Sequence, residues 1–218
     1  MGKTDLCIRL AHLFSAPIVN ADSRQVYREM KIGTARPDEA ELAQARFYFV
    51  GNLSITDYYS AARYEQDALR LLAELFRTSD YVILSGGSMM YVDAVVKGID
   101  DIPTVPDDIR AEMKQRLESE GLEALGDELK RLDPEYHAIV DLKNPRRVLH
   151  ALEICHSTGR TYTSFRVRAC KPRPFNIIKI GLNIPRPRLF ERINGRVDKM
   201  IAEGLVDEAR ELYPQRGL

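Results

Sequence analysis

The sequence has few cysteines, and their arrangement suggests neither a covalent framework nor a metal site. Cys7, Cys155 and Cys170 are odd in number and follow neither a CxxC nor a metal-ligand spacing. The histidines form no cluster either, because they are scattered over positions 12, 137, 150 and 156. We infer reduced, structural thiols, and we expect neither a disulfide framework nor a metal bound by histidine or cysteine.

Long apolar runs are absent as well. No window approaches the about 18 uninterrupted apolar residues that a transmembrane helix needs. The first residues lack the basic and then apolar order of a signal peptide. We therefore expect a cytoplasmic protein with no membrane partner. With 218 residues and 44% hydrophobic content, the chain can bury a core of one domain that carries a smaller insertion.

Net charge is also absent, because 32 basic residues balance 32 acidic ones, which argues against a protein that binds any polyanion. The charges are nevertheless uneven. No acidic residue lies between Glu153 and Glu191, an interval with eight basic residues: Arg160, Arg166, Arg168, Lys171, Arg173, Lys179, Arg186 and Arg188. Lys143, Arg146 and Arg147 lie just before this interval. This acid-free tract is a candidate nucleic-acid surface.

The first residues that carry chemistry are Gly2, Lys3 and Thr4. They precede a segment with helical apolar spacing, DLCIRLAHLF at 5–14. Gly-Lys-Thr before a helix is the end of the P-loop pattern, in which backbone N–H groups cradle phosphate, lysine neutralises its charge and threonine contacts Mg²⁺. The earlier part of that pattern is not in the sequence. These three residues alone are therefore a weak signal.

Two further segments end in polar or glycine-rich turns. The run APIVNAD predicts a short buried strand that ends at Asp22, and a helix should begin after Ser60. A second strand, 81–84, runs into Ser85-Gly86-Gly87-Ser88 and then into a helix closed by Gly98. This order is typical of parallel α/β proteins, whose ligands bind at the carboxyl ends of strands. Asp22 and Ser88 should share that edge.

The middle of the chain has a different character. Residues 107 to about 158 contain three helical segments, 107–120, 122–132 and one that begins at Asn144-Pro145. The apolar run 175–184 predicts a return to a strand, and a last helix should begin near Pro187. We thus predict an α/β fold with a P-loop NTPase-like parallel-sheet core in 1–106, a helical insertion in 107–174 and a return to the core in 175–218.

In this order the sequence resembles the tRNA dimethylallyltransferases. The resemblance rests on five collinear blocks: GKT at 2–4, ADSRQVYREMKIGTARP at 21–37, GGSMMYVDAVVKGIDDIP at 86–103, LDPEYHAIVDLKNPRRVLHALEI at 132–154 with TGRTY after it, and RINGRVDKMIAEGLVDEA at 192–209. It implies a P-loop core with a helical domain that grips the anticodon stem-loop. The implied reaction moves a dimethylallyl group from dimethylallyl diphosphate, with Mg²⁺, to N6 of adenine 37 in tRNAs that read codons beginning with U. A monomer is expected.

The resemblance also implies roles for individual residues at the reacting centre. Gly2, Lys3 and Thr4 would bind the diphosphate, with Thr4 near the magnesium or the bridging oxygen. Asp22 would accept a proton or hydrogen bond from adenine N6, which suits a carboxylate. Arg192 or Arg196, spaced one helical turn apart, would bind pyrophosphate, and Arg196 is the first choice. The catalytic set is therefore Asp22, Thr4 and Arg196.

A second set of implied roles concerns tRNA. Asp22, Ser23, Arg24, Gln25 and Ser88 correspond to positions that contact tRNA or the extruded base, and Ser88 replaces the usual threonine. The helix after Asn144 corresponds to further tRNA contacts at five consecutive positions: Arg146, Arg147, Val148, Leu149 and His150. An adenine inside a folded loop must leave its stack before it reacts, which costs a few kcal/mol that phosphate contacts can offset. We expect those contacts in the acid-free tract.

The family has a strand and a complete glycine loop before GKT, and some tens of residues of helix beyond position 218. The sequence therefore resembles an enzyme truncated at both ends, and we expect the 218-residue chain to be weakly active or inactive. Other functions stay open. A P-loop kinase of a small molecule would use GKT and Asp22 with ATP, a relative could prenylate free AMP or ADP, and a truncated chain could bind RNA without catalysis.

Overall fold

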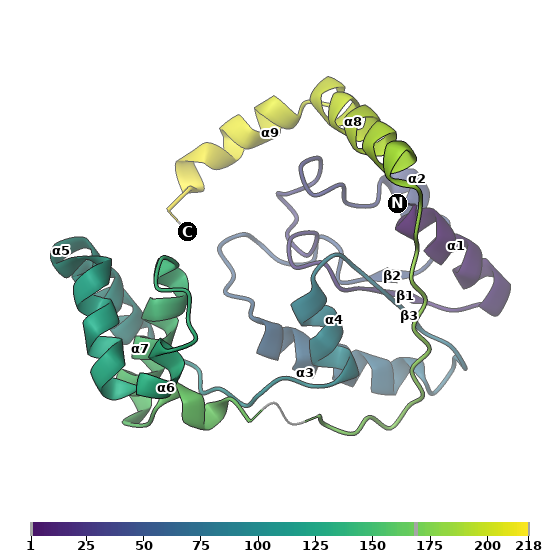
Figure 1. Ribbon diagram of the computed structural model, residues 1–218. Coiled ribbons are helices and arrows are strands. Elements are labelled where there is room, and N and C mark those ends of the chain that lie inside the picture. Colours follow the sequence, from purple (N-terminus) through teal and green to yellow (C-terminus); the bar gives the residue numbers. More distant parts are fainter. Residues whose placement is uncertain (1, 168–169, 218) are drawn as a thin grey trace. The chain divides into compact units, whose positions relative to one another are not determined.

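The computed structural model describes residues 2–167 and 170–217, and these residues form two compact units (Figure 1). Unit 1 comprises Met1–Gly98 and Lys171–Leu218, and unit 2 comprises Ile99–Cys170. The structural boundaries therefore lie at 98/99 and 170/171, a few residues before the predicted 106/107 and 174/175. Arg168 of the acid-free tract lies outside the described residues.

Unit 1 contains a three-stranded parallel sheet in the order β2-β1-β3. The strands are β1 (Ile18–Asn20), β2 (Phe47–Tyr48) and β3 (Ile83–Ser85). Ile18 of β1 lies opposite Phe47 on one side and Ile83 on the other. Because all three strands are parallel, their carboxyl ends meet at one edge. Asp22 follows β1 and Gly86 follows β3, so the predicted edge is present.

Helices cover both faces of this sheet. Successive side chains of β1 point to opposite faces, so neighbouring residues pack against different helices. Ile18 packs with Cys7, Ile8 and Ala11 of α1 (Lys3–Phe14). Val19 belongs to a second cluster with residues of two other helices, α3 (Ala61–Leu75) and α4 (Met89–Val96). The short α2 (Glu39–Leu42) begins with a capping box between Asp38 and Glu41.

The predicted starts of these elements are confirmed where a capping residue marked them. Ser60 caps α3 by accepting a hydrogen bond from the Arg63 backbone N–H at 3.3 Å. Asn144 caps α7 (Pro145–Thr158) in the same way, through the Arg147 backbone N–H. Side-chain caps are local interactions, so neighbouring residues suffice to predict them.

Unit 2 is helical, as predicted. In its core, α7 packs against α5 (Asp107–Leu132). The short α6 (Pro134–His137) and a 3₁₀ turn (Tyr162–Phe165) also contribute residues to this core. Gly121 interrupts α5 with φ 85° and ψ 166°, which divides it into the two predicted segments. Asp133 joins the start of α6 to the 3₁₀ turn. Its buried carboxylate accepts hydrogen bonds from Tyr136 N, Thr163 N and Thr163 Oγ1 at 2.7–3.0 Å.

The strand predicted for 175–184 is wrong. All ten residues are described, and none of them is in a strand. A strand needs a neighbouring backbone to pair with, and the described sheet pairs β3 only with β1. The segment instead leaves Ile178 and Ile180 81% and 67% exposed. Apolar content was the only signal for this strand, and it does not specify a partner.

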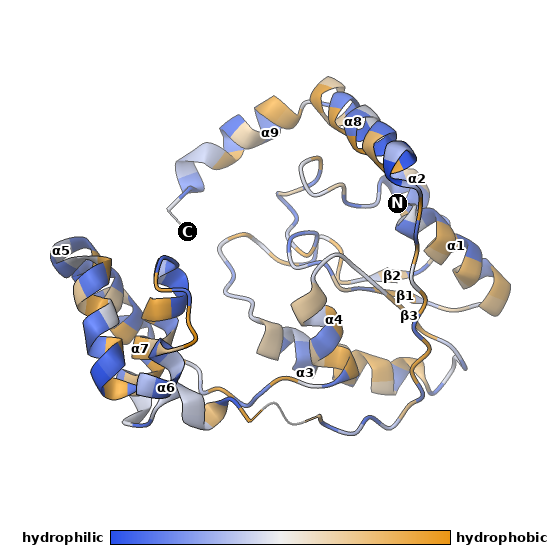
Figure 2. Cartoon of the chain, in the orientation of Figure 1, coloured by the Kyte–Doolittle hydropathy of each residue, from blue (hydrophilic) through white to orange (hydrophobic). Residues whose placement is uncertain are grey.

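The last helical segment consists of α8 (Arg186–Ala202), α9 (Leu205–Leu212) and a 3₁₀ turn (Tyr213–Gln215). The predicted helix near Pro187 is confirmed as α8. Both helices carry hydrophobic and hydrophilic residues side by side (Figure 2). Neither buries a residue, and Ile193 and Val197 of α8 are exposed. None of the described helices has the length and apolar content that crossing a membrane requires.

A buried ion pair fixes the point at which the chain returns to unit 1. Arg173 and Glu65 have side chains only 8% exposed, with Arg173 Nη2 2.6 Å from Glu65 Oε1. Arg173 also donates to the carbonyls of Ala94 and Val95 at the end of α4. Beside it, the Lys171 N–H donates to Lys97 O at 2.7 Å. The two backbone segments that lead into and out of unit 2 are thus bonded to each other.

Replacing Arg173 by alanine should lower the free energy of unfolding by about 3 kcal/mol, because the Glu65 carboxylate would stay buried without its closest partner. Lys171 Nζ lies 3.9 Å from Glu65 Oε1, so part of the Glu65 charge stays neutralised in the variant. The loss should therefore lie at the lower end of the range of about 3–5 kcal/mol that is typical of a broken buried ion pair. Denaturant titration measures the change. The control is Arg70→Ala, because the exposed Arg70–Asp67 pair should be worth less than about 1 kcal/mol. Equal losses in both variants would contradict the assignment.

Candidate active site

A small polar pocket of about 60 Å³ lies at the carboxyl edge of the sheet. It combines residues from the start of α1, the ends of β1 and β3 and the loops after them. The lining residues are Lys3, Thr4, Cys7, Ile18, Asn20, Asp22, Gln25, Pro37, Phe47, Ser85, Gly86 and Gly87. The structure therefore brings the predicted phosphate residues and the predicted acid to one place, although they are separated in sequence.

The N-terminus of α1 forms one wall of this pocket. Gly2 caps the helix in the left-handed conformation, with φ 74°, which glycine adopts without a steric penalty. The first N–H groups of a helix have no partner within the helix and carry partial positive charge, so this end suits an anion. Lys3 adds a full charge beside it, and its ammonium group donates to Gly86 O at 3.0 Å. Thr4 is half-buried and presents a hydroxyl to the same pocket.

Asp22 forms a second wall. Its Oδ1 accepts backbone hydrogen bonds from Arg24 at 3.0 Å and Gln25 at 3.4 Å, which closes a turn typical of aspartate. Oδ2 lies on the side of Gly87 and accepts no hydrogen bond among the described residues. One oxygen therefore holds the loop, while the other is available to a ligand.

Two glycines allow this close approach. A Cβ on Gly86 would lie 2.0 Å from Ala21 O, and a Cβ on Gly87 would lie 2.8 Å from Asp22 Oδ2. Real Cβ atoms do not approach other heavy atoms so closely, so neither position can accept a side chain without a shift of its neighbours. The sequence pattern marked Gly86-Gly87 as a turn, but it did not reveal that both residues touch the loop after β1.

Hydroxyl groups join the two loops as well. The Ser23 N–H donates to Ser88 Oγ at 2.8 Å, and the Ser88 hydroxyl donates to Ser23 Oγ at 2.8 Å. The side-chain amide of Gln25 does not take part in this link between the loops. Its Nε2 donates instead to the carbonyls of Thr34 and Ala35 at 3.0 Å each. Of the residues predicted to contact tRNA from this edge, these three have internal partners. Arg24 has an exposed side chain.

The structure distinguishes the two arginines of α8. A Cβ placed on Gly2 would lie 3.4 Å from Arg192 Nη1, so this guanidinium group is next to the N-terminus of α1. Arg196, the first choice from the sequence, is exposed one turn further along and shows no such approach to Gly2. Geometry therefore places Arg192, rather than Arg196, beside the N-terminus of α1.

Tyr64 and Tyr91 are buried in the same core cluster as Val19 and Ala21, at the carboxyl end of β1. The sequence did not single out Tyr91. Their rings stack with centroids 4.1 Å apart, and Tyr64 donates to Asn20 O at 2.9 Å. Burial, together with the charges of Tyr27 and Asp22, raises the pKa of Tyr91 to about 12. Burial also raises the pKa of the Cys7 thiol, although Ser85 and Lys3 oppose that shift. Near neutral pH both groups therefore stay protonated, so neither of them is available to accept a proton.

Unit 2 presents the predicted tRNA-binding residues on α7 unequally. Arg146, Arg147 and His150 are exposed, whereas Val148 is fully buried in the core of the unit and Leu149 packs against that core. The expectation that the Val148 side chain contacts tRNA is therefore wrong. Successive residues of a helix point in different directions, so a run of five cannot share one surface.

The acid-free tract is divided between the two units. It crosses from unit 2 into unit 1 between Cys170 and Lys171, and Arg173 is buried in its ion pair with Glu65. In unit 2, Arg160 lies over the Phe165 ring at 4.5 Å and Arg166 over the Tyr136 ring at 5.0 Å. Within the tract, Arg173 is not available for a tRNA contact, because a core interaction uses its charge.

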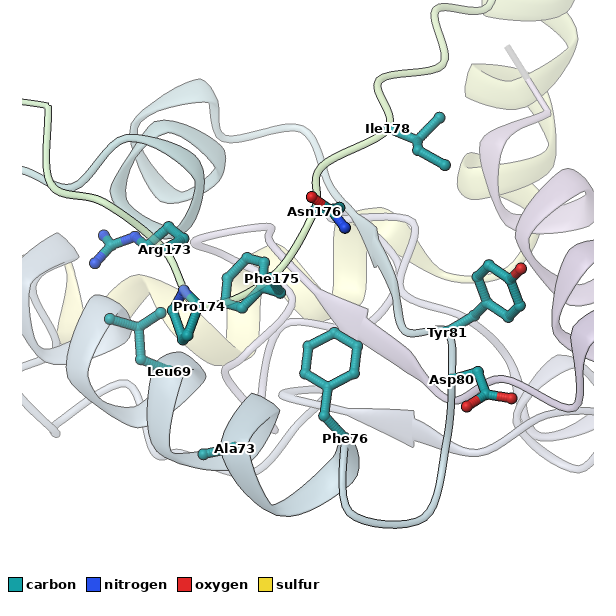
Figure 3. Close-up of a pocket in the computed structure, with 10 residues that line it drawn as sticks. All are labelled: Leu69, Ala73, Phe76, Asp80, Tyr81, Arg173, Pro174, Phe175, Asn176 and Ile178. Atoms are coloured by element: carbon teal, nitrogen blue, oxygen red, sulfur yellow. The ribbon is translucent and has the colours of Figure 1, made fainter.

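A larger cavity, of about 700 Å³, lies elsewhere in unit 1 (Figure 3). Its walls come from the end of α3, the segment before β3 and residues 173–178, and it shares no lining residue with the Asp22 pocket. Phe76 and Phe175 both line it and lie next to each other, with ring centroids 5.6 Å apart. The walls are mainly apolar and lack the convergent charged groups that chemistry requires. We therefore place the candidate active site at the smaller pocket.

The family model described as IPP transferase matches residues 25–218. The chain belongs to the IPP transferase family. A protein of Phocaeicola vulgatus named tRNA dimethylallyltransferase 1 is 59% identical over this whole chain, which covers 73% of that protein. A protein of Bacteroides thetaiotaomicron with the same name is 58% identical, again over the whole chain and over 71% of that protein. The resemblance seen in the sequence is thereby confirmed.

Solved structures of IPP transferases agree with the fold. The full-length tRNA isopentenylpyrophosphate transferase from Bacillus halodurans has a TM-score of 0.62 at 35% identity, over 98% of this chain and 67% of that one. A eukaryotic dimethylallyltransferase described as acting on tRNA has a TM-score of 0.71 at 23% identity, over 98% of this chain and 53% of that one. The second likeness supports the fold alone. The predicted α/β class with a parallel sheet is confirmed.

The residues of the pocket fit a magnesium ion only if the substrate supplies most of its ligands. The described residues contain no group of three or more His, Cys, Asp or Glu side chains that could hold a metal. Thr4 and Asp22 are among the pocket residues whose side chains carry oxygen atoms. Mg²⁺ commonly keeps only one or two protein ligands and takes the rest from phosphates and water, so this sparse set is compatible with it.

Proposed function

We propose that this IPP transferase moves a dimethylallyl group from dimethylallyl diphosphate to N6 of adenine 37, next to the anticodon, in tRNAs that read codons beginning with U. One observation carries the proposal beyond family membership. The free Oδ2 of Asp22 and the anion-binding end of α1 line the same pocket. A reaction that accepts a proton and releases an anion needs those two groups together.

The chemistry follows from the two walls of the pocket. The N6 lone pair forms a bond to allylic C1, and the C1–O bond breaks with its electron pair going to pyrophosphate. The N6 proton passes to Asp22 Oδ2. A carboxylate suits this role because it only accepts and because it faces the positive charge that develops on nitrogen.

The leaving pyrophosphate is stabilised at the other wall. Backbone N–H groups at the start of α1, the Lys3 ammonium group and the Arg192 guanidinium group all offer positive charge there. Such donors are fixed before the reaction begins, so they favour developing charge at little cost of reorganisation. Magnesium, held by Thr4 and the diphosphate, supplies further charge neutralisation when bound.

Recognition of tRNA divides between the two units. Ser23, Arg24, Gln25 and Ser88 lie in the loops next to Asp22 and Gly87, and Arg24 offers the exposed charge. On unit 2, Arg146, Arg147 and His150 offer exposed donors to the anticodon stem-loop. Phosphate contacts of this kind offset the cost of turning the adenine out of its stack. Activity in the cytoplasm and as a monomer stays a prediction.

Arg192→Ala should weaken pyrophosphate binding by the 218-residue chain about tenfold or more, since a charge-assisted hydrogen bond is worth about 1.5–3 kcal/mol. Arg196→Ala is the matched control, because it removes the same charge one turn away. Its effect should stay below about threefold, because the Arg196 guanidinium group does not approach Gly2 as that of Arg192 does. Isothermal titration calorimetry measures both constants. A larger loss at Arg196 would restore the choice made from the sequence.

Asp22→Asn should lower kcat about a hundred- to ten-thousand-fold, because the amide keeps the turn but cannot accept a proton. The relative from Phocaeicola vulgatus is longer than this chain. Turnover is therefore assayed in a chimera in which the 218 residues replace the matching stretch of that protein. Binding of the anticodon stem-loop should stay within about twofold, because the substitution keeps shape and only neutralises one acid. Asp5→Asn, exposed on α1, is the control. Unchanged turnover in Asp22→Asn would show that Asp22 is not the general base.

Arg146→Ala and Arg147→Ala should each weaken binding of an anticodon stem-loop, because each removes one phosphate contact. The slope of log K against log salt should fall by about 1 for each variant. Lys114→Ala, which removes an exposed cation from α5, is the control and should leave the slope unchanged. Fluorescence anisotropy at several salt concentrations measures the slopes. Slopes equal to that of the unmutated chain would place tRNA elsewhere.

A further inference from the structure

Glu208 on α9 holds the loop at 31–33 through three backbone hydrogen bonds. Its Oε2 accepts from the N–H groups of Lys31 at 2.9 Å and Ile32 at 2.7 Å, and its Oε1 accepts from Gly33 at 2.9 Å. Three successive N–H groups that converge on one carboxylate form an anion-binding concavity. Residues separated by about 175 positions in sequence are thereby joined within unit 1.

The fit around this carboxylate is close. A Cβ on Gly33 would lie 3.2 Å from Leu205 Cδ1 and 3.3 Å from Glu208 Oε1, both tighter than most real contacts. On the side of the helix, a Cβ on Gly204 would lie 4.0 Å from Ile32 Cδ1. The loop and the first turn of α9 therefore pack against each other as well as sharing hydrogen bonds.

Charge strengthens the contact. Burial alone would raise the pKa of Glu208, but the N–H donors of Gly33, Ile32 and Lys31 together with the Arg36 charge outweigh it. The pKa lies below its ordinary value, so the group is ionised near neutral pH. Hydrogen bonds to an ionised acceptor are about twice as strong as neutral ones.

The loop leads directly to Asp22. The carbonyls of Thr34 and Ala35, next to the clamped residues, accept both hydrogen bonds of the Gln25 amide at 3.0 Å. The Gln25 backbone N–H in turn donates to Asp22 Oδ1. A displacement of 31–33 therefore reaches the turn that orients the free oxygen of Asp22.

The helix leads to the other wall of the pocket. Gly204, with φ 100°, joins α9 to α8, and its carbonyl accepts the N–H of Glu208 at 3.0 Å. On α8, Arg192 Nη1 lies beside Gly2. The segment α8–α9 thus touches the loop after β1 at Glu208 and the start of α1 at Arg192.

We propose that Glu208 is a positioning residue that couples the two walls of the active site. By clamping 31–33 it fixes the turn at Asp22, and by anchoring α9 it places Arg192 beside the phosphate-binding end of α1. Glu208 itself touches neither substrate. This inference rests on the proposed prenyl transfer for its effect on catalysis, whereas the clamp itself does not.

Glu208→Gln tests the clamp, because an amide nitrogen cannot accept the N–H groups that the carboxylate accepts. Hydrogen exchange of the 31–33 amides in the 218-residue chain should accelerate about tenfold or more, as the loss of a charge-assisted hydrogen bond predicts. Glu211→Gln, exposed on the same helix, is the control and should not change that exchange. Gly33→Ala disturbs the same contact from the loop side and should act in the same direction. Unchanged exchange in both Glu208→Gln and Gly33→Ala would overturn the proposal.

A double-mutant cycle with Arg192→Ala tests the coupling. Glu208→Gln alone should weaken pyrophosphate binding about tenfold, and the double variant should bind about as weakly as Arg192→Ala, because both changes remove one interaction. A residue with a merely structural role would leave binding by the folded fraction unchanged or give additive losses, and either result would overturn the coupling. The cycle is measured on the 218-residue chain and on the chimera, where the KM for dimethylallyl diphosphate should follow the same pattern.

The two proposals fail in different ways. If neither unmutated protein binds pyrophosphate, the proposed prenyl transfer and the coupling fall together, while faster exchange at 31–33 still establishes the clamp. If the unmutated proteins bind pyrophosphate and Arg192→Ala weakens that binding but Glu208→Gln does not, prenyl transfer stands and the role of Glu208 is refuted.

Discussion

The contact between the backbones of Gly86 and Ala21 is the constraint on which the active site depends. The two strand ends approach so closely that a Cβ on Gly86 would lie 2.0 Å from Ala21 O, and Ala21 N donates to Ser85 O at 2.8 Å. Because no side chain separates the strand ends, Ser88 reaches Ser23 and the Lys3 ammonium group reaches Gly86 O. A wider gap would separate Asp22 from the N-terminus of α1.

Much of this arrangement could be predicted from local signals. Ser60 and Asn144 mark helix starts through hydrogen bonds to residues three positions away, and Gly121 divides α5 because its backbone conformation is not helical. The order of strands, turns and helices also predicts a parallel sheet, which places Asp22 and Ser88 at one edge. The chemistry of the pocket thus follows from residue types and from the topology of parallel α/β proteins.

The errors concern properties that depend on distant residues. The apolar segment 175–184 has the composition of a strand, but the described sheet offers it no partner. Arg173 looked like a charge for RNA, and only the fold shows the buried Glu65 beside it. Local spacing could not distinguish Arg192 from Arg196 either, because both lie on one helix. Only the position of Gly2 distinguishes them. The clamp by Glu208 joins segments too distant in sequence for any pattern to reveal.

The hydrogen bond between Lys171 and Lys97 has a consequence for how the chain is organised. Since the segments that leave and re-enter unit 1 are already bonded at 2.7 Å, the whole of unit 2 is a loop whose ends are closed by the core itself. The entropy of closing such a loop grows only slowly with its length. Insertions or deletions within the helical unit would therefore change the stability of the sheet very little, and the helices of unit 2 could vary in length while the pocket at Asp22 keeps its geometry.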